Sequence, residues 1–219
     1  MRIFFLVWGF LPRIFLPRVF LPWVFLPRSI LLLVILQLGA CKEPALPSPF
    51  HATDVTWRHT QADFQLTDFN GQPRRLSDFK SKVVVLFFGY THCPDVCPTT
   101  LADLAQVMRQ LGKDAQRVQV LFVTLDPERD TPALLAKFVP SFDPAFLALY
   151  GDPQATALAA QAFGVKYAKQ QNKRGGYTLD HSDGLYLLGL RNKPLLLSAH
   201  GQRAEYLLQD IKVLLALGR

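Results

Sequence analysis

One uninterrupted apolar run, at residues 83–88, constrains the fold of this chain more than any other segment. The run reads Val-Val-Val-Leu-Phe-Phe and is followed by Gly89. A run this short, rich in β-branched and aromatic residues, is typical of a strand buried on both faces. Residues 118–125 form a second run of the same kind. Because such strands occupy the centre of a sheet that helices cover, we expect a layered α/β domain built around these two segments.

Helical patterns follow and separate the two buried runs. Leucine and methionine recur at helical spacing through residues 101–111, and this helix is expected to end at Gly112. Two further helices are expected to begin at the pairs Thr131-Pro132 and Asp152-Pro153, where a capping residue precedes a proline. A last helix is predicted for residues 203–217.

Two β-hairpins complete the predicted order. The first lies at residues 64–72 and turns at Asn70-Gly71, and the second joins residues 185–190 to residues 195–198. Strand, helix, strand and helix, then a hairpin and a helix, describe a thioredoxin-like α/β sandwich. We therefore expect a central mixed β-sheet flanked by helices, with an N-terminal β-hairpin, over residues 58–219.

The first forty residues differ from the rest of the chain. They contain four copies of a five-residue Phe-Leu-Pro repeat within residues 10–29, and a proline at every fifth position breaks a membrane-spanning helix. An apolar stretch then leads into small residues, as in an export signal. Residues 1–40 are thus interpreted as a leader. Its end, Leu38-Gly39-Ala40-Cys41, resembles a bacterial lipobox, so Cys41 is expected to carry a lipid.

The sequence after the leader predicts an exported, membrane-attached domain with an ordinary surface charge. Residues 41–57 are rich in proline and are interpreted as a stiff tether at the periplasmic face of a bacterial cell membrane. Four of the 24 basic residues but none of the 17 acidic ones lie in the leader, so the remainder carries about +3 rather than +7. A charge this small gives no basis for nucleic-acid binding.

Cys93 and Cys97 follow the first buried strand directly. This places them at the carboxyl edge of the sheet, where open α/β sheets bind ligands. We expect both thiols on the first turn of a helix, whose N-terminus lowers thiol pKa values. Two thiolates satisfy Cu(I), and the imidazole of His181 would complete a ligand set suited to Cu(II). The sequence therefore predicts a copper site formed by Cys93, Cys97 and His181, with His92 pointing away from it.

Three separated motifs resemble those of the Sco/SenC family of copper chaperones. They are Phe-Phe-Gly-Tyr-Thr-His-Cys-Pro-Asp-Val-Cys-Pro at residues 87–98, Thr-Leu-Asp-Pro-Glu-Arg-Asp-Thr-Pro at 124–132 and Asp-His-Ser at 180–182. The resemblance implies a membrane-tethered protein that delivers copper to the binuclear copper centre of cytochrome c oxidase subunit II, or reduces that subunit's cysteines. Such a protein is a metallochaperone rather than an enzyme, and a copper donor protein and a thiol reductant would be further partners.

The resemblance also assigns residues. Cys93, Cys97 and His181 match the three copper ligands of the family. Asp126 and Asp180 lie in the other two motifs and are candidates for supporting roles, because residues 126–130 are expected near the copper edge. The alternative is that residues 126–130 only form a loop leading into the helix cap at Thr131.

Two other classes of function stay open. In a periplasmic thiol-disulfide oxidoreductase of thioredoxin-like type, Cys93 and Cys97 would form a redox-active disulfide. Their Cys-x3-Cys spacing differs from the Cys-x2-Cys redox motif. Residues 167–193 also contain no proline that could serve as the cis-proline of thioredoxins. The third class is a redox or copper sensor, which the sequence does not separate from a chaperone.

Overall fold

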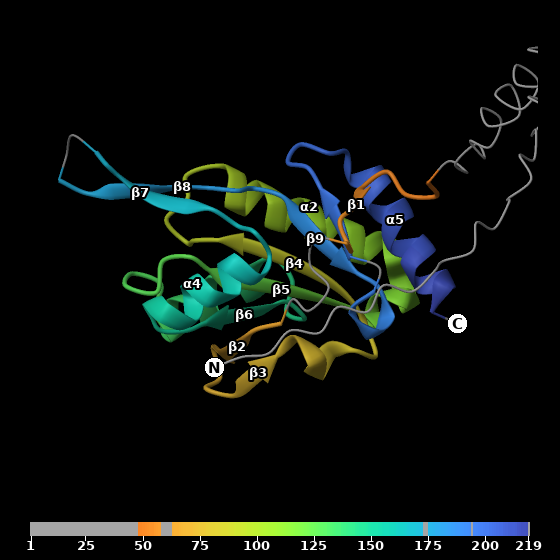
Figure 1. Ribbon diagram of the computed structural model, residues 1–219, viewed down its shortest axis with the longest axis horizontal. Coiled ribbons are helices and arrows are strands. Elements are labelled where there is room, and N and C mark those ends of the chain that lie inside the picture. The colour runs from red at the N-terminus through yellow and green to blue at the C-terminus, as the bar shows by residue number, and fades with distance from the viewer. Residues whose placement is uncertain (1–47, 58–62, 173–174, 194, 219) are drawn as a thin grey trace, which may run out of the picture. The chain divides into compact units, whose positions relative to one another are not determined.

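The computed structural model describes residues 48–57, 63–172, 175–193 and 195–218. In this part of the chain, eight strands form one sheet and two more form a separate hairpin (Figure 1). The predicted leader and Cys41 lie outside the described residues. No helix in the described part is both long enough and apolar enough to cross a lipid bilayer.

The main sheet is mixed. Its three central strands run parallel to one another, and the strands on either side of them pair antiparallel. Across the sheet the order is β1 (Thr53–Asp54), β10 (Leu195–Ser198), β9 (Leu185–Leu188), β4 (Val83–Gly89), β5 (Val118–Thr124), β6 (Leu147–Tyr150), β2 (Gln65–Asp68) and β3 (Pro73–Arg75). The predicted mixed sheet and N-terminal hairpin are confirmed.

Strand β4 is buried along its whole length, as the apolar run predicts. Successive side chains of a strand point to opposite faces of the sheet. Phe87 meets Phe122 edge-on with ring centroids 5.8 Å apart, whereas Phe88 meets Phe163 on the other face at 5.7 Å. Both faces therefore carry aromatic side chains, and both need helices to cover them.

Within the described ranges, four α-helices and several short turns supply this cover. Helix α2 (Val96–Leu111) packs side by side with α5 (Ala204–Leu217) (Figure 1). Helix α3 (Pro132–Phe138) lies on the Phe87 face, since Phe138 contacts Phe122, and α4 (Pro153–Ala162) ends beside Phe163 on the other face. Among the described residues, 3-10 turns occur at Leu76–Phe79, Gly112–Arg117, Val139–Ser141 and Leu190–Asn192.

The predicted helix starts are confirmed by their caps. The Thr131 hydroxyl accepts a hydrogen bond from the Leu134 amide at 3.3 Å, and the Asp152 carboxylate accepts one from the Ala155 amide at 2.7 Å. Each cap satisfies one of the free N–H groups at a helix N-terminus. Gly112 ends α2 with a positive φ of 55°.

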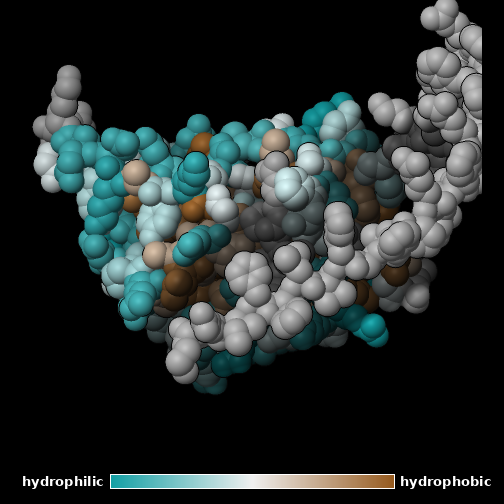
Figure 2. Space-filling view, in the orientation of Figure 1, coloured by the Kyte–Doolittle hydropathy of each residue, from teal (hydrophilic) through white to brown (hydrophobic). Residues whose placement is uncertain are grey.

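A two-stranded hairpin that the sequence analysis did not predict projects from the domain. It consists of β7 (Tyr167–Gln171) and β8 (Tyr177–His181), which pair with each other and not with the main sheet (Figure 1). Most of its side chains are exposed and its surface is hydrophilic (Figure 2). The hairpin is important because its last residue is the predicted ligand His181.

Part of the segment predicted as a tether belongs to the domain. Strand β1 pairs with β10, and the amides of His51 and Ala52 each donate to the buried carboxylate of Asp210 at 2.8 Å. These bonds fix residues 51–54 against α5 and the edge of the sheet. The domain therefore includes residues before position 58.

Candidate metal centre

Cys93 and Cys97 lie at the carboxyl end of β4, as predicted. The amide of Cys93 donates to the carbonyl oxygen of Tyr90 at 3.3 Å, and α2 begins at Val96. The expectation that both thiols sit on the first helical turn is wrong for Cys93, because Asp95 has a φ of −145° and interrupts the helical geometry. The pair is nevertheless kept together, since the amide of Cys97 donates to Sγ of Cys93 at 3.4 Å.

The two thiols have different surroundings. Cys93 is half-buried, whereas Cys97 is fully buried. Burial raises the pKa of the Cys97 thiol strongly, and its hydrogen bond with Cys93 adds to this effect. The predicted lowering of the pKa at the helix N-terminus is therefore wrong for Cys97, because the loss of hydration outweighs the helix dipole. In the copper-free protein, the Cys97 thiol therefore keeps its proton at neutral pH.

His181 reaches the cysteine pair from the hairpin. Its Nε2 lies 3.9 Å from Sγ of Cys97, and its Nδ1 lies 2.8 Å from the carbonyl oxygen of Ser182. Because a carbonyl oxygen only accepts hydrogen bonds, the proton of the neutral ring is on Nδ1. Nε2 then carries the lone pair and faces the Cys97 thiol, which is the tautomer a metal ligand needs.

The backbone around His181 is fixed at the base of the hairpin. His181 pairs with Tyr167 in the two-stranded sheet, and the Ser182 amide donates to the carbonyl oxygen of Lys166 at 2.9 Å. The Ser182 hydroxyl accepts in turn from the Lys166 amide at 3.1 Å. His181 was expected on a loop, but the structure places it at the end of a strand, which holds its position more firmly.

Gly89, the last residue of β4, leaves room for the buried thiol. A Cβ atom at this position would lie 2.8 Å from Sγ of Cys97 and 2.9 Å from the ring of Phe122. Both separations are shorter than van der Waals contact allows. The absence of a side chain at Gly89 therefore sets how closely Cys97 approaches the end of the central strand.

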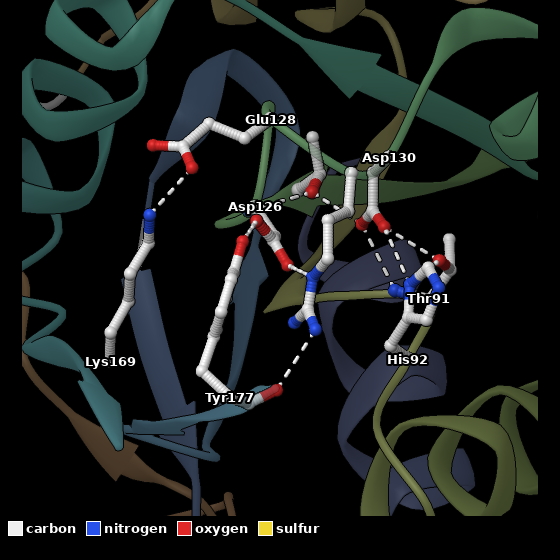
Figure 3. Close-up of polar contacts among 9 residues, drawn as sticks. Thr91, His92, Asp126, Glu128, Asp130, Lys169 and Tyr177 are labelled. Atoms are coloured by element: carbon white, nitrogen blue, oxygen red, sulfur yellow. Dashed lines mark hydrogen bonds and ion pairs between the residues drawn. The ribbon is translucent and has the colours of Figure 1, made fainter. Parts of the chain in front are cut away.

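An acidic loop after β5 supports the site, and its buried Asp130 contacts the turn before Cys93 (Figure 3). The Asp130 carboxylate accepts hydrogen bonds from the amide of Thr91 at 2.9 Å and from the Thr91 hydroxyl at 2.6 Å. A third bond comes from the hydroxyl of Thr124 at 2.6 Å. These bonds fix the turn that precedes Cys93. Asp130 lies in the segment 126–130 that the sequence offered as a possible support, but neither Asp130 nor Thr91 could be singled out from its motif.

The other residues named from the sequence have different surroundings. Asp126 is buried and accepts hydrogen bonds from the Tyr177 hydroxyl at 2.7 Å and from Nε of Arg129 at 2.5 Å. Asp180 is on β8 with its side chain exposed. His92 is exposed, and its Nδ1 lies 3.1 Å from the Thr91 hydroxyl (Figure 3). The side-chain partners of Asp126 are thus Tyr177 and Arg129 rather than the cysteine pair.

The three predicted ligands are neighbours but do not yet form a closed metal site. Among the residues that the structure describes, no three His, Cys, Asp or Glu side chains are already grouped to hold a metal ion. Sγ of Cys93 is engaged with the backbone of Cys97, and Nε2 of His181 faces the Cys97 thiol. Rotation of side chains between their staggered rotamers would therefore have to precede binding by all three donors.

Comparison with known proteins places this arrangement in context. The SCO1/SenC family model matches residues 54–216. The mitochondrial SCO2 homolog of Mus musculus is 44% identical over 131 residues, which cover 58% of this chain and 51% of the mouse protein. The chain therefore spans about half the length of this relative.

Solved structures match the domain closely. ScoI of Bradyrhizobium japonicum, solved with copper bound, is 41% identical, with a TM-score of 0.63 over 69% of this chain and 96% of that one. BsSco, a member of the Sco family of cytochrome c oxidase assembly proteins, is 22% identical with a TM-score of 0.57, and it supports the fold alone. The domain has a thioredoxin-like fold. Because the family model matches most of the length of this chain, the chain belongs to the SCO1/SenC family.

Proposed function

We propose that this protein is a copper chaperone for the assembly of cytochrome c oxidase. It binds Cu(I) and Cu(II) through Cys93, Cys97 and His181. The observation that carries the proposal is the 3.9 Å approach of His181 Nε2 to Sγ of Cys97, with Nδ1 held by the carbonyl of Ser182. Two thiols and one correctly oriented imidazole, brought together from the turn before α2, from the start of α2 and from a distant hairpin, form a donor set that suits copper.

The surroundings of Cys97 indicate how the cargo would be held and released. Cu(I) accepts a small number of soft donors, so two thiolates suffice, whereas Cu(II) prefers an additional nitrogen donor. Binding at Cys97 displaces a proton, since a thiol that coordinates a metal is deprotonated. Copper transfer would proceed by exchange of these thiolates for those of an acceptor, without net chemistry on a substrate.

The acceptor is proposed to be subunit II of cytochrome c oxidase, with a copper donor protein and a thiol reductant as further partners. The location is proposed to be the periplasmic face of a bacterial cell membrane, with Cys41 carrying the lipid anchor. Incorporation of labelled palmitate into the wild-type protein but not into Cys41→Ser supports the anchor. Equal labelling of both proteins contradicts it.

A transfer assay tests the chaperone role. The Cu(I)-loaded protein is mixed with the soluble copper domain of subunit II, whose two cysteines are first reduced, and copper is measured on each protein after separation. Movement of copper to the acceptor supports the proposal. Retention of copper by the donor at all acceptor concentrations contradicts it.

The thiol-disulfide oxidoreductase is the second candidate, because the two cysteines are neighbours, with the Cys97 amide donating to Sγ of Cys93 at 3.4 Å. It predicts that the copper-free, reduced protein reduces an oxidised acceptor domain while Cys93 and Cys97 become a disulfide. Each product can be followed by mass after alkylation. Reduction without any copper transfer would favour this function over the chaperone.

A further inference from the structure

The loop after β5 contacts both halves of the candidate copper site. Its Asp130 binds Thr91 in the turn before Cys93, as described above. Its other acidic and basic residues face the hairpin that ends at His181 (Figure 3). Asp126 accepts from the Tyr177 hydroxyl, and Glu128 pairs with Lys169 at 2.7 Å. One loop therefore fixes the turn before the cysteines and the hairpin that carries the histidine.

Arg129 makes the most extensive contacts of this loop. Its Nε donates to Asp126 at 2.5 Å, and its Nη1 donates to the backbone carbonyl of Tyr177 at 2.9 Å. The guanidinium also lies over the ring of Tyr177, 3.7 Å from its centroid, and 5.9 Å from that of Tyr90. Arg129 is therefore bound to the hairpin through a hydrogen bond and through a cation–π contact.

These contacts continue to the predicted ligand. Tyr90 is buried, and its ring meets the imidazole of His181 edge-on, with centroids 5.9 Å apart. Tyr177, Arg129, Tyr90 and His181 thus form a continuous row of packed planar groups. Tyr177 and His181 are the two ends of β8, and because they are four residues apart their side chains share one face of the strand.

The hydrogen bonds of Arg129 do not use all of the donors of its guanidinium group. Its Nη2 is buried and has no hydrogen-bond partner among the described residues. Buried polar atoms are normally paired, and an unpaired one costs stability. A planar guanidinium at position 129 can nevertheless stack on the Tyr177 ring and donate hydrogen bonds from its edge at the same time.

We propose that Arg129 is a positioning residue for His181, acting through Tyr177 and Tyr90 to set the approach of Nε2 to Sγ of Cys97. The guanidinium fixes the start of β8, and the row of rings fixes the imidazole at its end. The expected change in metal affinity rests on the proposed copper function, whereas the positioning of the His181 ring does not. Because His181 serves Cu(II) more than Cu(I), loosening this row lowers the affinity for Cu(II) selectively.

The test compares two arginine variants. Arg129→Lys keeps the charge but loses the planar fork, which matters at a stacked site with two hydrogen bonds. Arg74→Lys is the matched control, because Arg74 Nε donates to the fully buried Asp68 at 2.8 Å, in a similar pair on the N-terminal hairpin. We expect Arg129→Lys to lower Cu(II) affinity about tenfold and Cu(I) affinity less than about twofold. Arg74→Lys should change neither affinity, even if it lowers thermal stability equally.

A measurement on the copper-free proteins separates this inference from the copper proposal. Nuclear Overhauser contacts between the His181 and Tyr90 rings are recorded for wild type, Arg129→Lys and Arg74→Lys. We expect Arg129→Lys alone to lose them, and to shift the thiolate-to-Cu(II) absorption band in the loaded protein. Retention of both signals in Arg129→Lys would overturn the positioning role. If wild type binds no copper, the ring contacts still decide the question.

A second pair of variants keeps the test valid if Arg129→Lys does not fold. Tyr177→Phe retains the ring beneath the guanidinium and loses only the hydroxyl bond to Asp126, whereas Tyr177→Leu removes the ring. We expect Tyr177→Phe to resemble wild type in its His181 contacts and Tyr177→Leu to resemble Arg129→Lys. Equal behaviour of the two Tyr177 variants would contradict transmission through the stacked rings.

Discussion

Asp130 accepts two hydrogen bonds from Thr91, one from its amide at 2.9 Å and one from its hydroxyl at 2.6 Å, across 39 residues of sequence. The carboxylate is almost completely buried, so water does not compete for these bonds. They join the loop after β5 to the turn that leads into Cys93. The position of the half-buried Cys93 thiol thus depends on a residue that is not a ligand.

Replacing Asp130 by asparagine is expected to destabilise the protein by about 1–3 kcal/mol, because the amide nitrogen cannot accept the hydrogen bonds that the carboxylate oxygens accept. Urea unfolding of the copper-free protein measures the change. Asp103→Asn on the exposed side of α2 is the control. It should alter stability by less than about 0.5 kcal/mol. Similar losses in both variants would show that Asp130 has no special structural role.

Gly89→Ala should disturb the buried thiol. The new methyl group would lie 2.8 Å from Sγ of Cys97, so the sulfur or the strand has to move. Overpacking of this kind costs about 1–3 kcal/mol. Gly71→Ala is a useful comparison, since nothing lies within 4 Å of a Cβ there and only its φ of +79° resists the change. Both variants should lose stability, but Gly89→Ala alone should lose copper affinity.

The two thiols should react with iodoacetamide in a fixed order. Cys93 is half-buried, whereas Cys97 is fully buried and has a raised thiol pKa, so it exposes little thiolate at neutral pH. We expect Cys93 to be alkylated first in the reduced, copper-free protein. Peptide mass spectrometry over time checks this, and in denaturant the two rates should become similar. Earlier modification of Cys97 would contradict the burial argument.

The raised pKa of Cys97 also predicts a loss of stability at alkaline pH. Below the ordinary thiol pKa of 9.0 the group is protonated in both the folded and the unfolded chain. Above it the unfolded chain releases the proton and the folded chain retains it, so the free energy of unfolding falls as pH rises. Between about pH 8 and about pH 10, wild type should lose roughly 1 kcal/mol more than Cys97→Ala. A constant difference between the two proteins would contradict this shift.

Much of the fold follows from local sequence patterns. The buried run at residues 83–88 is short, apolar and rich in β-branched and aromatic residues, which favours a central strand. The capping pairs at Thr131 and Asp152 mark two helix starts. Strand β1 has only two residues, which is too short for a period to be recognised. Hairpin β7–β8 was missed because most of its side chains are exposed and carry no apolar alternation.

The residues of the candidate site could be named from sequence, but their environment could not. The motifs single out Cys93, Cys97 and His181 as donors. The pKa of Cys97 depends on how deeply the folded domain buries the thiol, and the spacing of residues in the sequence does not reveal that burial. Likewise, the row from Tyr177 to His181 forms only when the loop after β5 meets a separate hairpin. Arg129 was quoted within a motif, but its stacking partners lie far away in sequence.

Copper content and absorption of the reduced domain after loading with Cu(II) test the central claim most directly. We expect one copper per chain and a thiolate-to-copper band for wild type. His181→Ala should lose the band yet keep Cu(I), whereas Cys93→Ser and Cys97→Ser should lose stoichiometric binding. A full complement of copper in either cysteine variant, or equal loss of Cu(I) and Cu(II) in His181→Ala, would contradict the three-ligand site.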